Sequence, residues 1–205
     1  MFAVITGDIV NSTLIKAEEE QELIQMIQAL LSPHPSDFFR GDSFQAFVED
    51  PREAIRKAML CRTAAKSLVA EDAPVQADVR LSIGYGDVTL PVVKLATAKG
   101  EAFLLSGRAL DEMPKAGGKI IISCRDKLPA IAFTVIADYI NSLFSQLTQK
   151  QAEVIHQLLL GLNQQQVADK LNKSKSTISQ HVTAGKWDEI ENIIRNHDQL
   201  MQLIS

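Results

Sequence analysis

The chain has 205 residues, enough for one large domain or for a medium domain followed by a small one. Its 46% hydrophobic content excludes a disordered chain, and its formal net charge of −4 gives no indication of nucleic-acid binding over the chain as a whole. Cys61 and Cys124 lack metal-binding spacing, so both are expected to be reduced thiols. No stretch approaches the roughly 20 apolar residues of a membrane helix, and no secretion signal is recognisable. The sequence therefore predicts a cytoplasmic protein with no membrane partner.

The first half of the chain alternates short strands with helices. Residues 2–6 form an apolar run that predicts a buried strand, and a helix is expected from a cap at Ser12 or Thr13 to Leu31. Residues 38–48 predict a hairpin that turns at Gly41 and Asp42. The dipeptide at 50–51, an Asp followed by a Pro, predicts the start of a helix that continues to about residue 70.

Further strands are expected at residues 78–88 and 119–123, on either side of a helix at 101–113. The resulting order βαββαβ, followed by one more helix and strand, predicts an α+β domain with a ferredoxin-like fold and an extension. We assign this domain to residues 1–125, a connecting helix to 126–146, and a small all-α domain to 147–205.

The last domain has the pattern of a helix-turn-helix. Thr148 caps an expected helix at 149–160, a short helix follows at 164–171, and Ser174 caps a third helix that ends near Ala184. A fourth helix is expected from Trp187 to the C-terminus. A short helix, a tight turn and a second short helix form the DNA-docking geometry in which the second helix enters the major groove.

The third helix carries the candidate DNA-reading face. Ile178 and Val182 are one turn apart and should face the core. The side chains on the other faces can bind base edges or phosphates; they are Lys175, Ser176, Ser179, Gln180 and Thr183. Basic residues exceed acidic ones over 163–186, which favours DNA as a partner of this segment. His156 and His181 are expected on helix surfaces.

The segment from residue 147, LTQKQAEVI, through LGLNQQQVADKL to STISQHV resembles the helix-turn-helix of the LuxR proteins and of sigma-factor region 4. This resemblance implies DNA binding. The alternative interpretation is a helical bundle that only dimerises or docks on a protein.

A second candidate site lies in the first domain. Residues 6–13 read TGDIVNST and residues 40–44 read RGDSF. Because the first and third strands of a ferredoxin-like sheet are antiparallel neighbours, Asp8 and Asp42 should converge on one spot. Two close carboxylates repel unless a proton or a cation lies between them. Hard oxygen ligands favour Mg²⁺ or Mn²⁺. The alternative is a capped strand end and a tight turn.

This arrangement resembles the class III nucleotidyl cyclase domain over roughly residues 2–123. The resemblance implies a nucleotide or phosphate ligand, and metal binding by Asp8, Asp42 and the backbone carbonyl of Ile9. The family's purine-selecting lysine is replaced by Phe38, and its Asn–Arg pair is replaced by SGRALD at 106–111. These departures weigh against cyclase catalysis. Tentative phosphate ligands are Arg40 and Arg108.

Over its whole length the chain resembles the SatD family, with VITGDIV at 4–10, GDSFQ at 41–45 and WDE at 187–189. We therefore expect a homodimeric transcription regulator whose cyclase-like domain binds a small ligand, such as a nucleotide with Mg²⁺. One alternative is a divergent metal-dependent cyclase or phosphotransfer enzyme with a regulatory helix-turn-helix. Another is an adaptor in which both halves contact proteins.

Overall fold

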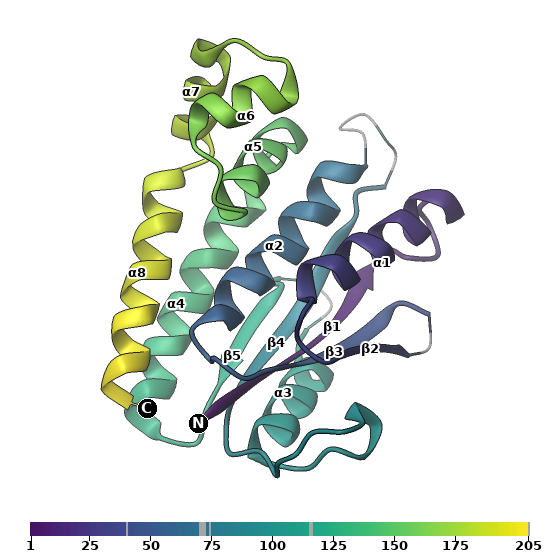
Figure 1. The fold of residues 1–205 in the computed structure, drawn as a ribbon, viewed down its shortest axis with the longest axis vertical. Coiled ribbons are helices and arrows are strands. Elements are labelled where there is room, and N and C mark those ends of the chain that lie inside the picture. Colours follow the sequence, from purple (N-terminus) through teal and green to yellow (C-terminus); the bar gives the residue numbers. More distant parts are fainter. Residues whose placement is uncertain (40, 70–72, 74, 115–116, 205) are drawn as a thin grey trace.

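A computed structural model describes residues 1–39, 41–69, 73, 75–114 and 117–204. Its centre is a five-stranded sheet in the order β2-β3-β1-β4-β5 (Figure 1). The first three pairings across this sheet are antiparallel, and β4 and β5 are parallel. The strands are β1 (Phe2–Val10), β2 (Ser36–Phe39), β3 (Ser43–Val48), β4 (Asp78–Gly86) and β5 (Ile120–Ser123).

The helices of the first domain confirm the predicted fold class. The chain order β1-α1-β2-β3-α2-β4 with the sheet order β2-β3-β1-β4 is ferredoxin-like, and α3 with β5 is the predicted extension. These helices are α1 (Ala17–Leu31), α2 (Glu53–Leu68) and α3 (Glu101–Glu112), and a short 3₁₀ turn, η1 (Leu95–Thr97), precedes α3. Helix α4 (Lys127–Ser145) occupies the segment expected to connect the two domains.

The predicted start of the first helix is wrong. Strand β1 continues to Val10, and Asn11 takes a left-handed conformation with φ of 62°, so the chain turns before it can enter a helix. Helix α1 begins only at Ala17, after Lys16. Ser12 therefore caps nothing, and its hydroxyl is available for another partner.

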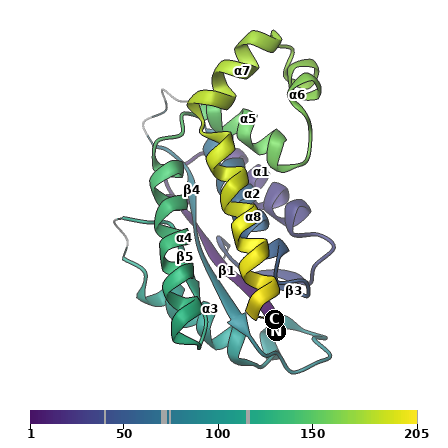
Figure 2. The same cartoon turned by 90° about the vertical axis from the view of Figure 1, so that its left-hand side faces the viewer.

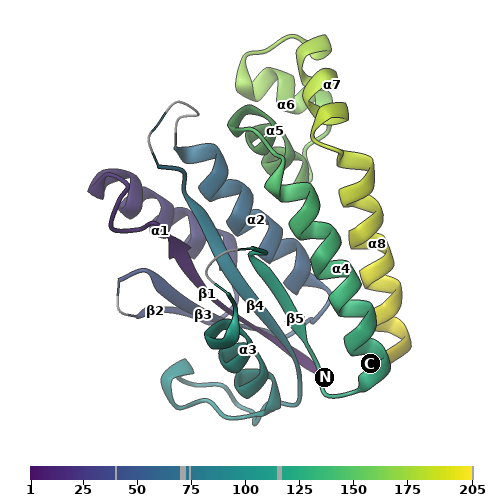
Figure 3. The same cartoon turned by 180° about the vertical axis from the view of Figure 1, so that it is seen from behind.

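The main core fills one face of the sheet. The side chains of alternate strand residues on that face pack against α1, α2, α4 and the C-terminal helices in a single continuous cluster. Helix α3 covers part of the opposite face (Figure 3), where Val4, Phe47 and Ala102 form a small second core. The rest of that face, where Asp8 and Arg80 lie, is left outside both clusters.

The C-terminal helices are anchored on this body. They are α5 (Gln149–Leu159), α6 (Gln164–Leu171), α7 (Lys175–Ala184) and α8 (Trp187–Ile204). Helix α5 packs on α2, where Arg56 donates a hydrogen bond to the Leu159 carbonyl (3.2 Å). Helix α8 runs back along α4, so the C-terminal end of the chain lies near the N-terminus (Figures 1 and 2). Of these four helices, α6 and α7 project beyond the body (Figure 1).

Two histidines of this unit are buried in it. His156 was expected on a helix surface, but it is 5% exposed and lies 2.9 Å from the Thr63 hydroxyl of α2. His197 on α8 is fully buried. Burial lowers the pKa of each of these imidazoles to about 4, because the charged form would lose its hydration.

Candidate functional site

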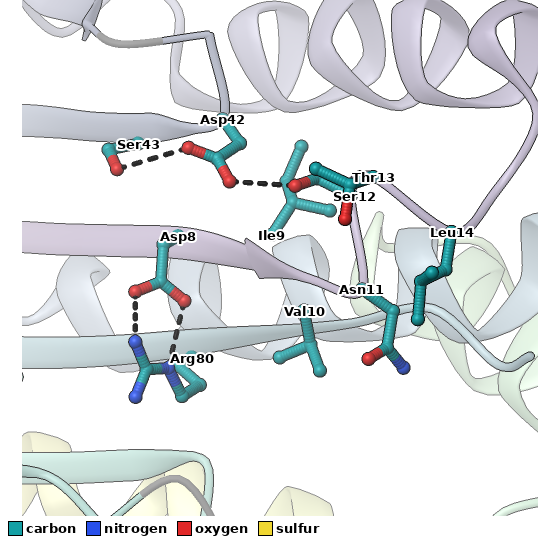
Figure 4. Close-up of a pocket in the computed structure, with 10 residues that line it drawn as sticks. All are labelled: Asp8, Ile9, Val10, Asn11, Ser12, Thr13, Leu14, Asp42, Ser43 and Arg80. Atoms are coloured by element: carbon teal, nitrogen blue, oxygen red, sulfur yellow. Dashed lines mark hydrogen bonds and ion pairs between the residues drawn. The ribbon is translucent and has the colours of Figure 1, made fainter.

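The end of strand β1 opens into a cleft of about 460 Å³ (Figure 4). The cleft forms where β1 leaves the sheet and the chain loops towards α1, so that backbone, hydroxyl and charged groups gather there. Its lining residues are Asp8, Ile9, Val10, Asn11, Ser12, Thr13, Leu14, Asp42, Ser43 and Arg80.

Strand register brings the two predicted aspartates to this cleft. Asp8 lies opposite Ser43 in the antiparallel pair of β1 and β3, so Asp42 is the next residue towards the cleft. The Ile9 amide donates a hydrogen bond to the Asp42 carbonyl (3.1 Å), which extends the ladder by one step. Asp8 and Asp42 therefore line the same cleft, as expected, but their carboxylates do not converge on one spot.

The side chain of Asp8 is held by Arg80, a residue that the sequence argument missed. The two residues are direct partners across β1 and β4. The Arg80 guanidinium donates from Nε to Oδ1 of Asp8 (2.9 Å) and from Nη2 to Oδ2, which is a bidentate pair. The hydrogen bonds to Asp8 raise the pKa of Arg80 above its ordinary value. Both side chains are about one-fifth exposed, so the pair is partly shielded from water.

The carboxylate of Asp42 has different partners. The Ser12 hydroxyl donates to its Oδ2 (2.7 Å), and the Ser43 hydroxyl lies 3.4 Å from its Oδ1. Figure 4 shows Asp42 turned towards Ser12 and Asp8 turned towards Arg80. Asp42 therefore fastens the loop after β1 to the start of β3.

These residues do not fit a divalent ion in this arrangement. The predicted Mg²⁺ or Mn²⁺ ligands were Asp8, Ile9 and Asp42, but both oxygens of Asp8 bind Arg80. Within the described parts of the chain, no group of three His, Cys, Asp or Glu side chains is placed to hold a metal ion. A cation at Asp8 would have to displace a guanidinium that already neutralises the carboxylate.

Of the two tentative phosphate ligands, Arg108 is not brought to the cleft. Arg40 lies outside the described residues. Arg108 is exposed on α3 and does not line the cleft. Helix α3 instead contributes Ser106, which accepts a hydrogen bond from Thr6 (2.9 Å) and so fixes α3 on the sheet.

The helix-turn-helix forms as expected. Asn163 and Ser174 cap α6 and α7 by accepting hydrogen bonds from backbone amides three residues ahead. Asn172 ends α6 in the left-handed conformation, which makes the sharp turn between the two helices. Ile178 and Val182 are buried against the neighbouring helices, as predicted.

The predicted reading face of α7 is open to solvent. Each of its five residues is exposed: Lys175, Ser176, Ser179, Gln180 and Thr183. Lys170 and Lys173 are also exposed beside this face, whereas Asp169 accepts a hydrogen bond from Gln165 (2.9 Å). Helix α7 therefore presents polar and basic side chains at the end of the molecule farthest from the sheet (Figure 1).

Comparisons with known proteins bear on each half of the chain. Residues 145–184, which contain α5, α6 and α7, match the model of the family described as bacterial regulatory proteins, luxR family. The fold is similar to two structures of a bacterial light-regulated adenylyl cyclase. One is 12% identical with a TM-score of 0.41 over 60% of this chain and 74% of that chain. The other is 14% identical with a TM-score of 0.41, over 62% of this chain and 44% of that chain. No curated protein matches the sequence.

Proposed function

We propose that this protein is a cytoplasmic, DNA-binding transcription regulator of the SatD type. The observation that carries the proposal is the exposed polar face of α7 within a segment that matches the luxR family of regulators. In this position Gln180 can pair with adenine and Lys175 with guanine or phosphate. The amides at the start of α7 favour a phosphate oxygen.

The first domain is proposed to bind a small ligand in the cleft and to take part in a homodimer. Two carboxylates and one guanidinium give the cleft a net charge of minus one, which disfavours a phosphate group. A nucleotide or phosphate ligand therefore has to draw Arg80 away from Asp8, or bring a cation with it. Either event would change the contacts of β1, β4 and the loop after β1.

DNA binding is tested by fluorescence anisotropy on the full chain, with DNA selected from a random pool. We expect the Lys175→Ala/Gln180→Ala variant to bind the selected site at least tenfold more weakly at low salt. Lys94→Ala is the matched control, because Lys94 is an exposed lysine before η1 and lies outside the helix-turn-helix. Equal binding by the wild type and the double variant would contradict the proposal.

Ligand binding is tested separately by a thermal-shift screen of nucleotides and phosphate, with and without Mg²⁺ or Mn²⁺. A ligand of the cleft should raise the melting temperature of the wild type and not that of Asp42→Asn. Formation of a cyclic product from ATP or GTP, lost in Asp8→Ala, would instead establish the enzyme alternative.

A further inference from the structure

Helix α4 is apolar on two opposite sides. One side is buried in the core through Phe133, Ala137, Ile140 and Phe144. The other side carries a solvent-exposed row of large apolar residues, which we call the α4 stripe: Leu128 (80% exposed), Ile131 (64%), Val135 (63%) and Tyr139 (45%). Spacings of three or four residues place these side chains in one line along the helix.

The apolar side chains of the α4 stripe are not explained by packing in the core. Contrary to the expectation from the sequence, the helix Lys127–Ser145 is long and apolar enough to cross a membrane by length and composition, and 22% of its most apolar 18-residue window is buried. Contiguous exposed apolar patches are uncommon on monomeric proteins and mark contact surfaces. The question is therefore what covers this side of α4.

The charges beside the α4 stripe favour a second copy of the chain. Lys127 and Asp138 are the charged residues of α4. They are 11 residues apart, so at 3.6 residues per turn they lie within about 20° of each other around the helix axis. Both therefore stand on the same flank of the stripe, near its two ends. Neither forms an ion pair within the described residues.

A two-fold axis across the middle of the α4 stripe would bring these charges together. When two copies of α4 pack antiparallel about this axis, the same flank of each helix lies on the same side of the pair. Along that side, the residues of the second helix follow each other in the opposite direction. Lys127 then lies level with the partner's Asp138, and the contact occurs twice. The centres of the two stripes, Ile131 and Val135, meet at the axis.

We propose that the α4 stripe is a homodimer interface in which α4 packs antiparallel against α4 of a second copy. This assignment rests on the dimer of the proposed function and names its surface. Because each α4 leads directly into its own α5, the two reading helices would lie at opposite ends of the dimer. Their separation would exceed the length of α4, about 28 Å for 19 residues.

The interface is tested by sedimentation velocity of the full chain without DNA, from 1 to 100 µM. We expect a wild-type dimer, and at least a hundredfold weaker association for Ile131→Asp and for Val135→Asp. Since both side chains are solvent-exposed, neither variant should lower the melting temperature by more than a few degrees. Leu203→Asp is the matched control, because Leu203 is 83% exposed on α8, outside the stripe, and its variant should remain dimeric.

A charge exchange tests the antiparallel orientation. Lys127→Glu and Asp138→Lys should each weaken the dimer, and the double variant should recover affinity towards that of the wild type. A monomeric wild type at 100 µM would overturn the proposal. So would equal dissociation of Ile131→Asp and Leu203→Asp, or no recovery in the double variant. Flotation of a monomeric wild type with phosphatidylethanolamine–phosphatidylglycerol vesicles, lost in Ile131→Asp, would identify a membrane as the occupant instead.

Failure of this interface and failure of DNA binding give different results. Monomeric Ile131→Asp should still bind a single half-site at low salt and should lose cooperative binding to two half-sites. A dimer that binds no selected DNA would contradict the proposed regulator and leave the interface standing.

Discussion

The Tyr85 hydroxyl and Nε2 of His197 lie 2.7 Å apart, and this contact joins strand β4 to helix α8 inside the core. The Phe133 ring of α4 stacks on Tyr85, with 4.9 Å between the ring centroids, and shields this hydrogen bond from water. His156 and Thr63 form the corresponding contact between α5 and α2. Each buried histidine therefore connects the C-terminal helices to the sheet domain.

These histidines make the folded protein sensitive to acid. Their pKa of about 4 in the folded state lies below the ordinary 6.5, because burial disfavours the charged ring. Between these values the unfolded chain binds more protons, so the free energy of unfolding falls as the pH falls from about 6.5 towards 4. We expect each histidine to account for a loss of roughly 2 kcal/mol between pH 7 and pH 5.

Urea denaturation at pH 7 and pH 5 measures this loss. The variants His156→Gln and His197→Gln should each show a smaller difference between the two pH values than the wild type. His181→Gln is the control, because it removes a histidine of α7 that is only partly buried. The same pH difference in all four proteins would contradict the argument.

Arg80 should keep divalent ions away from Asp8. Its replacement by Met removes the charge and the bidentate hydrogen bonds, and leaves two carboxylates at the cleft with a net charge of minus two. We expect Arg80→Met to bind Mn²⁺ at least tenfold more tightly than the wild type, as measured by isothermal titration calorimetry. Arg80→Lys retains the charge and should bind Mn²⁺ no more tightly than the wild type. The double variant Asp8→Asn/Arg80→Met should lose the affinity for Mn²⁺ that Arg80→Met gains. Equally tight, Asp8-dependent binding by the wild type would support the original metal prediction.

Arg62 should be a major contributor to stability. It is 2% exposed, donates two hydrogen bonds to Asp78 (2.9 and 2.7 Å), and lies 5.2 Å above the Phe144 ring. Removal of one member of a buried ion pair costs about 3 kcal/mol or more, because it leaves the other charge unpaired. Arg62→Met should therefore lower the free energy of unfolding by about 3 kcal/mol. In urea denaturation, Arg62→Met/Asp78→Asn should be less destabilised than the sum of the single variants; additive effects would contradict the pairing.

Gly84 is required by the close packing of α3 on β4. A Cβ atom at this position would lie 2.3 Å from the Ala102 carbonyl oxygen and 2.6 Å from the Ser106 amide. Since both atoms belong to the backbone, Gly84→Ala should destabilise the protein by about 1–3 kcal/mol. Gly107→Ala is the matched control, because its Cβ meets nothing within 4 Å and alanine favours the helix. Thermal denaturation should give a lower melting temperature for the first variant alone.

Local patterns were sufficient for most of the fold. The alternation in residues 78–86 and the caps at Thr148 and Ser174 specify their elements without help from distant residues, and the sheet order followed from the ferredoxin-like arrangement. The start of α1 was misjudged because Ser12 can bind either a helix amide or a distant carboxylate. Its partner, Asp42, is 30 residues away in sequence.

The candidate cleft was predictable in position and not in chemistry. Strand register places Asp8 beside Asp42, and this proximity could be predicted from the sequence. Arg80 was missed because it stands between Val79 and Leu81 as an ordinary outward-facing polar residue of a strand. Its pairing with Asp8 depends on which residue of β4 lies opposite β1, and that register is a tertiary property. The burial of His156 depends in the same way on the packing of α5 against α2.

The continuous core has a mechanical consequence for regulation. Since α5 contacts α2 and α8 contacts Tyr85 of β4, the helices on both sides of α6 and α7 are packed on the sheet domain. In the proposed dimer, binding of the proposed ligand at the cleft would therefore act on DNA by changing how the two protomers are oriented relative to each other.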